Sequence, residues 1–170
     1  MATRKILTEG DPTLEKHSHP VTKFDDKLHA LLDDMRETMT EAHGAGLAAP
    51  QVGILRRAVL VMNDEDEILE LINPEIVSAT GEQDGLEGCL SIPGYYGFVK
   101  RPNEVTVRAR DRHGKPFTAS GTGLTARAFC HETEHLDGLL YTRLVEGKLM
   151  TGEEVDRLIE EEERAAKKEE

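Results

Sequence analysis

The stretch from Cys130 to Gly138 contains the pattern His-Glu-x-x-His. His131 and His135 are four residues apart, so on a helix both imidazoles lie on one face and can bind the same metal ion. Glu132 follows the first histidine and lies within reach of a water molecule at that metal. The pattern therefore predicts a helical metal site with a carboxylate beside it, which suggests an enzyme that activates water.

Two imidazoles do not complete a catalytic metal site, which needs a third protein ligand and one open position. One metalloprotease class places a third histidine six residues after the second, and that position here is Tyr141. Cys89 is another candidate, because a bound metal deprotonates a thiol, although a lone cysteine is often a small buried hydrophobe. Cys130 would point about 100° away from His131 on a helix and is assigned to packing. A further class takes its ligand from a downstream glutamate, here Glu146, Glu153 or Glu154.

Composition narrows the class of protein. A chain of 170 residues with 38% hydrophobic content fits one domain with a buried core. We expect that domain at 1–150, with a C-terminal helix and acidic tail of the same domain at 151–170. The formal net charge of −12 argues against a phosphate-binding surface, and so against direct DNA binding. Any RNA contact would have to be local. Two cysteines and no long apolar stretch predict a cytoplasmic protein with reduced thiols and no membrane contact.

Hydrophobic periodicity predicts helices and strands along the chain. A helix over about 24–42 should pack through apolar residues that include Met35 and Met39. A second helix, from about 123 to 136, should be capped by Thr122, carry both histidines and end at Gly138. A third helix from about 152 should pack through Val155, Leu158 and Ile159. Strands are predicted at 57–62, 68–72 and 104–110, with turns at 63–66, 73–74 and 111–114.

Three segments, taken in order, resemble those of the polypeptide deformylase family: Gly44–Gln51, Glu87–Ser91 and His131–Gly138. The resemblance runs from about Arg4 to about Val145. It implies an α+β fold, with mixed or antiparallel sheets around a central helix that carries the two histidines, and with an N-terminal and a C-terminal helix. It also implies metal-dependent hydrolysis of the N-formyl group from N-formylmethionyl peptides of nascent proteins, with release of formate.

The resemblance implies a role for each site residue. Cys89, His131 and His135 would bind the metal, and Glu132 would act as general base and then as acid. The Gln51 side-chain amide and the Leu90 backbone N–H would stabilise the oxyanion. Close approach of the peptide substrate is expected at small residues: Gly44, Ala45, Gly46 and Gly88. Leu124 and Ala128 either line the slot for the substrate methionine or belong to the core.

The same resemblance suggests iron(II) as the physiological metal, although zinc, nickel or cobalt also suit a Cys-His-His site. The chain departs from the family pattern at Thr133, Glu134 and Cys130, which bears on hydrogen bonding around the metal. Some relatives dock on the ribosome through a basic C-terminal helix, whereas the corresponding end here is rich in glutamate. Two other functions stay open at this point: an HExxH metallopeptidase of another family, and a non-catalytic peptide-binding relative.

Overall fold

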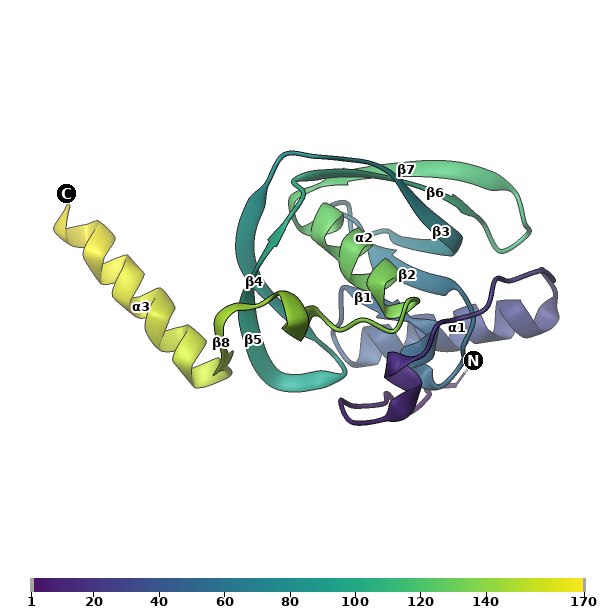
Figure 1. Cartoon of the computed structure of the whole chain (residues 1–170), viewed down its shortest axis with the longest axis horizontal. Helices are drawn as coiled ribbons and strands as arrows, with labels where there is room; N and C mark the ends of the chain where they lie inside the picture. Colours follow the sequence, from purple (N-terminus) through teal and green to yellow (C-terminus); the bar gives the residue numbers. More distant parts are fainter. Residues whose placement is uncertain (1, 170) are drawn as a thin grey trace.

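A computed structural model describes residues 2–169 (Figure 1). The helices are α1 (Asp26–Glu41), α2 (Gly123–His135) and α3 (Gly152–Lys168), with short 3-10 turns η1 (Pro12–Glu15), η2 (Ala49–Val52) and η3 (Tyr141–Leu144). The strands are β1 (Gly46–Ala48), β2 (Ala58–Met62), β3 (Ile68–Thr80), β4 (Gln83–Cys89), β5 (Ile92–Arg101), β6 (Glu104–Arg110), β7 (Pro116–Thr122) and β8 (Glu146–Thr151).

The larger sheet has five antiparallel strands in the order β1-β2-β3-β6-β7. Successive side chains of β2 point to opposite faces, as the pleat of a strand requires. Ala58 and Leu60 pack in the cluster that contains α1, whereas Val59 and Val61 pack in the cluster that contains α2. The sheet therefore separates two helices, and α2 lies on its inner face (Figure 1).

Helix α1 confirms the predicted amphipathic segment. Asp25 caps it by accepting a hydrogen bond from the Leu28 N–H at 3.1 Å. Its buried face includes Met35 and Met39, both fully buried, so their assignment to the core was right. Cys130 is likewise packed in the core cluster on the other face of the sheet.

The smaller sheet has three antiparallel strands in the order β4-β5-β8. Ile92, Val99 and Tyr141 form a separate buried cluster against it. The sheet extends around the far end of α2, and β4 carries Cys89 toward that helix (Figure 1). The site is therefore built between a helix on one sheet and a strand of the other.

Helix α3 projects from the rest of the molecule (Figure 1). It contacts β5 and β8 and contains no fully buried residue. Val155 and Leu158 are half-buried, so the predicted packing is wrong only for Ile159. Ile159 remains 44% exposed. The assignment of 1–150 and 151–170 to one domain stays a prediction.

The predicted turn at Asn73–Pro74 was also wrong, because β3 continues through it to Thr80. The chain forms a bulge there instead: the register shifts between Ile72 and Glu75, and Asn73 has a φ of 51°. The Asn73 side chain accepts from the Val21 N–H and donates to the Val21 carbonyl, at 2.8 and 2.9 Å. An Asn-Pro pair that would usually interrupt a strand thus anchors the N-terminal segment.

The ends of α2 differ in detail from the prediction. Thr122 occupies the N-cap position, but its side chain makes no capping hydrogen bond. The helix ends at His135, and Gly138 follows with a φ of 75°. A side chain at Gly138 would collide with the backbone of Glu15, so glycine is required there by contact as well as by conformation.

The predicted fold class is confirmed: two antiparallel sheets surround the helix that carries the histidines, with one helix before it and one after it. The predicted strands at β2 and β6 are present. No helix within residues 2–169 is both long enough and apolar enough to cross a membrane.

Candidate active site

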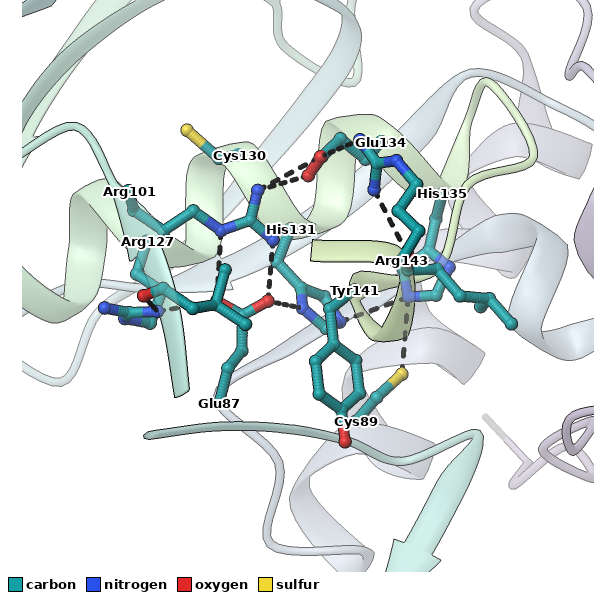
Figure 2. Close-up of polar contacts among 12 residues, drawn as sticks. Glu87, Cys89, Arg101, Arg127, Cys130, His131, Glu134, His135, Tyr141 and Arg143 are labelled. Carbon is teal, nitrogen blue, oxygen red and sulfur yellow. Dashed lines mark hydrogen bonds and ion pairs between the residues drawn. The ribbon is translucent and has the colours of Figure 1, made fainter. Parts of the chain in front are cut away.

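The two histidines and Cys89 come together as a compact group of donor atoms (Figure 2). The Nε2 atoms of His131 and His135 lie 3.2 Å apart, and Cys89 Sγ lies 3.4 Å from His135 Nε2. All three donor atoms lie within 4.8 Å of one another. Nitrogen and sulfur ligands around a tetrahedral zinc ion are separated by about 3.3–3.6 Å. The spacing of these side chains therefore fits a metal ion.

The hydrogen bonds of His131 also fit metal binding. Its Nδ1–H donates to Glu87 Oε2 at 2.7 Å, so Nε2 is the ring nitrogen that faces His135. Burial and the neighbouring His131 lower the pKa of His135 to about 3, so its ring is neutral. A neutral imidazole is the form that binds metal. The downstream glutamates proposed as alternatives are not in this group, and neither is Tyr141, whose ring lies 5.7 Å from that of His131.

Glu132 lies beside this group and is buried. Its Oε1 has no hydrogen-bond partner among the described residues. Burial raises the pKa of Glu132 to about 7, and the negative charge of Glu87 adds to the effect. A carboxyl group with such a pKa can accept and return a proton near neutral pH.

Steric contacts inside the site explain why glycine occupies positions 44 and 46. A Cβ added at Gly46 would overlap the Glu132 carboxylate, and one added at Gly44 would come within 2.7 Å of the Leu90 side chain. The backbone of β1 thus passes directly over the catalytic carboxylate candidate. Glycine at these positions permits contacts inside the site, in addition to any approach by a substrate.

Both polar atoms of the Gln51 side-chain amide are hydrogen-bonded. Its Oε1 accepts from the Ala48 N–H at 2.9 Å, and its Nε2 donates to Ser91 Oγ at 3.1 Å. The same Nε2 lies 3.5 Å from Cys89 Sγ. The amide nitrogen therefore lies at the metal-site candidate, and only 1% of the residue is exposed.

A buried ionic network supports His131 from behind (Figure 2). Glu87 binds Arg101 through Nε and Nη2, at 3.1 and 2.7 Å, and Arg127 Nη1 at 2.9 Å. Burial alone would raise the pKa of Glu87, but its hydrogen bonds to His131 and Arg101 lower it to about 2. Glu87 is therefore a carboxylate that orients the ring of His131.

The network continues to the end of α2. Arg101 Nη1 also donates to both Glu134 oxygens, and Arg143 Nη2 donates to Glu134 Oε2 at 2.8 Å. No pattern in the sequence predicted a role for Glu87, Arg101, Arg127 or Arg143. The one available signal was the position of Glu87, which lies in the same short motif as Cys89.

A cavity of about 500 Å³ opens onto the site. Its lining includes the small residues predicted to meet substrate, Gly44, Ala45, Gly46 and Gly88, together with Cys89, Leu90, His131 and Glu132. Leu124 and Ala128 also line it. Leu124 is 74% exposed, which rules out the core as the alternative for this residue. A cavity of this size accommodates a short peptide end.

A model of the polypeptide deformylase family matches residues 3–148. The chain belongs to this family. It is 53% identical over 165 residues to a peptide deformylase of Lachnoclostridium phytofermentans, which covers 96% of this chain and 99% of that protein. Peptide deformylase 1 of Bacillus subtilis is 52% identical over 143 residues, covering 84% and 89% of the two chains.

Solved deformylase structures have the same fold. A peptide deformylase of Legionella pneumophila superposes with a TM-score of 0.82 at 46% identity, covering 85% of this chain and 87% of that one. A deformylase of Synechococcus elongatus in complex with actinonin gives a TM-score of 0.82 at 38% identity, covering 87% and 81%. The family resemblance inferred from three short motifs is therefore confirmed over most of the chain.

Deformylation of N-formyl peptides during translation is the function of this family, and the predicted enzyme class is likewise confirmed. Deformylases are metalloenzymes that act on formylated peptides. The alternative of an HExxH metallopeptidase from another family loses its support, because the match covers the whole site region.

The N-terminal segment ties the three deformylase motifs together. Within residues 7–18, which we call the N-terminal strap, three backbone N–H groups donate to carbonyl groups in those motifs. Leu7 donates to Gln51 at 2.7 Å, Glu9 donates to Ser91 at 2.8 Å, and Ser18 donates to Leu136 at 2.8 Å. The strap thus connects every segment that contributes to the site.

Proposed function

We propose that Cys89, His131 and His135 bind one divalent metal ion, which is iron(II) in the cell. The observation that carries this proposal is the convergence of Cys89 Sγ and two Nε2 atoms within 4.8 Å. Thiolate and imidazole donors accept iron(II), zinc, nickel and cobalt, and family resemblance favours iron(II). A bound divalent ion supplies Lewis acidity, which lowers the pKa of water and polarises a carbonyl group.

Glu132 is the proton carrier of the reaction. Its buried carboxylate takes a proton from the attacking water and delivers it to the departing amine. The pKa of about 7 supports this role, because the group changes protonation state readily at neutral pH. Gly46 keeps the space that the carboxylate needs.

Gln51 and Leu90 stabilise the negative charge that develops on the formyl oxygen. The Gln51 amide is held rigidly by Ala48 and Ser91, so little reorganisation accompanies the reaction. The Leu90 backbone N–H is the second donor. Each of the two donors contributes about 3 kcal/mol to stabilisation of the transition state.

The substrate is an N-formylmethionyl peptide bound in the cavity of about 500 Å³. Gly44, Ala45, Gly46 and Gly88 let its backbone approach closely, and Leu124 and Ala128 border the methionine side chain. The protein acts in the cytoplasm and does not bind DNA directly. Helix α3 has seven acidic and four basic side chains, so it does not favour docking on ribosomal RNA.

Replacement of Glu132 by Gln tests the proton-transfer role. We expect formate release from formyl-Met-Ala-Ser to fall by about 10²–10⁴-fold, with bound metal unchanged. Glu146→Gln is the matched control, because Glu146 is an exposed carboxylate and was an alternative third ligand. Turnover by Glu132→Gln at the normal rate would remove Glu132 from the mechanism. Internal cleavage of peptides without formate would point to a peptidase.

Replacement of Cys89 by Ala tests the metal site independently of catalysis. We expect metal affinity to fall by at least about 10-fold, measured by competition with a chromogenic chelator under anaerobic conditions. The variant should keep the antiparallel sheets, as circular dichroism would report. Unchanged metal affinity would eliminate Cys89 as a ligand.

A further inference from the structure

A second cavity, of about 490 Å³, lies at the start of α1. Its lining includes Lys27, Leu28 and Leu31 from the first two turns of that helix. The active-site cavity begins beyond the other end of α1, at Ala42. A helix of 16 residues is about 24 Å long, so the two cavities are well separated.

This second cavity, which we call the basic pocket, has an unusual charge for so acidic a chain. Four cationic residues line it, Arg4, Lys23, Lys27 and Arg56, against a single acidic residue, Asp25. The Asp25 carboxylate is used as the cap of α1. The pocket therefore carries net positive charge on a protein whose formal net charge is −12.

Three of these cations are available to a partner. Arg4 pairs with Asp34 at 2.9 Å, whereas Lys23, Lys27 and Arg56 make no ion pair with any residue in the range 2–169. All three of the latter are exposed. A site for one small anion would enclose its cations, whereas exposed cations at a rim suit a large polyanion that releases counterions on binding.

The floor of the basic pocket is apolar. Val21, Leu28 and Leu31 are each 6% exposed, and Ile54 lies beside them. Bases stack on aromatic rings or arginine planes, which this floor lacks, so it is the cationic rim that would hold a polyanion, through its phosphates. The combination of an apolar floor and a cationic rim is that of a local nucleic-acid contact.

The charge distribution also orients the molecule. Helix α3, with seven acidic and four basic side chains, lies at one end of the long axis. The chain enters α1 at the opposite end (Figure 1). A polyanion would therefore repel the α3 end and attract the end with the basic pocket.

We propose that the basic pocket binds the phosphate backbone of RNA. The inference draws its biological sense from the action of the family on nascent proteins, since these emerge from an RNA-rich assembly. The contact involves neither the metal site nor the active-site cavity. RNA binding and deformylation can therefore be measured separately on the same protein.

The test combines three substitutions, Lys23→Gln, Lys27→Gln and Arg56→Gln, in the metal-loaded full chain. The probe is a fluorescein-labelled RNA hairpin with a single-stranded loop, followed by anisotropy at several salt concentrations. For the unmodified protein, three phosphate contacts predict a slope of about −2 when the logarithm of the RNA-binding constant is plotted against the logarithm of the salt concentration. We expect the triple variant to bind at least about 10-fold more weakly at 50 mM salt, with a slope near zero.

A matched control carries Lys115→Gln, Arg157→Gln and Lys167→Gln, which remove the same charge from exposed positions elsewhere. It should bind RNA like the unmodified protein, and both variants should release formate from formyl-Met-Ala-Ser at the normal rate. Equal RNA binding by the two triple variants would overturn the proposal, as would absence of binding by the unmodified protein. Displacement of the hairpin by equimolar inorganic phosphate or ATP would instead assign the pocket to a small anion. Loss of formate release with intact RNA binding would count against the proposed active site alone.

Discussion

Glu87 and Glu70 are each held by two arginines, and the two carboxylates are used differently. Glu87, with 4% of its side chain exposed, binds Arg101 and Arg127 and also His131. Glu70, with 11% exposed, binds Arg36 and Arg112 on the larger sheet and touches no part of the site. The same pairing chemistry thus stabilises structure in one place, and in the other also orients a metal-ligand candidate.

The largest effect should come from Glu87→Gln. The substitution removes the carboxylate that Arg101 and Arg127 share, so that Arg101 keeps only Glu134, and it weakens the acceptor for His131 Nδ1–H. We expect the free energy of unfolding of the metal-free protein to fall by about 3–5 kcal/mol in urea titration. Metal affinity should fall by about 10- to 100-fold in chelator competition. An unchanged metal affinity would mean that Glu87 only stabilises the fold.

Glu70→Gln should lower the stability of the fold without affecting the metal site. Loss of two charged hydrogen-bond partners predicts a decrease of about 2 kcal/mol in the free energy of unfolding, with unchanged metal affinity and formate release. Burial raises the pKa of Glu70, but hydrogen bonds from Arg112 and Arg36 lower it overall below its ordinary value of 4.5.

Because the folded-state pKa lies below the unfolded one, the contribution of Glu70 is complete above about pH 4.5 and disappears as the pH falls through the folded pKa. The stability difference between the unmodified protein and Glu70→Gln should therefore be constant between pH 6 and 8 and shrink toward pH 3. A difference that grows in acid would contradict this account.

The smallest effect is expected for Arg108→Met. Arg108 pairs with Glu75 at 3.2 Å, but 58% and 66% of the two side chains are exposed. Solvent screens such a pair, so the free energy of unfolding should change by no more than about 0.5 kcal/mol. A loss as large as that of Glu70→Gln would show that burial is not what separates these ion pairs.

Local patterns in the sequence predicted much of the fold and the main donor atoms. The four-residue spacing of His131 and His135 determines their common face on α2. The strand pattern over 57–62 and the alternation along 104–110 identified β2 and β6. These predictions succeed because helix and strand periodicity depend on neighbours in the chain. The placement of Cys89 beside the histidines was confirmed only by the fold, and its role as ligand stays a proposal.

Longer-range contacts could not be predicted in the same way. Arg101 reaches Glu87 because β4 and β5 pair in one particular register, and it reaches Glu134 because both strands curve around α2. The Asn73–Pro74 pair has the composition of a turn, and a turn was predicted there. The residue that holds Asn73 in a bulge is Val21, 52 positions away. In each case the deciding interaction joins residues that no local window contains.

The N-terminal strap has a consequence for the order in which the molecule is completed during synthesis. Its three amides leave the ribosome before any of their acceptors, and the last acceptor, at Leu136, arrives more than a hundred residues later than Ser18. The hydrogen bonds of the strap are therefore completed only after α2 has been synthesised. Extensions or deletions that disturb residues 7–18 therefore act on the reaction centre itself.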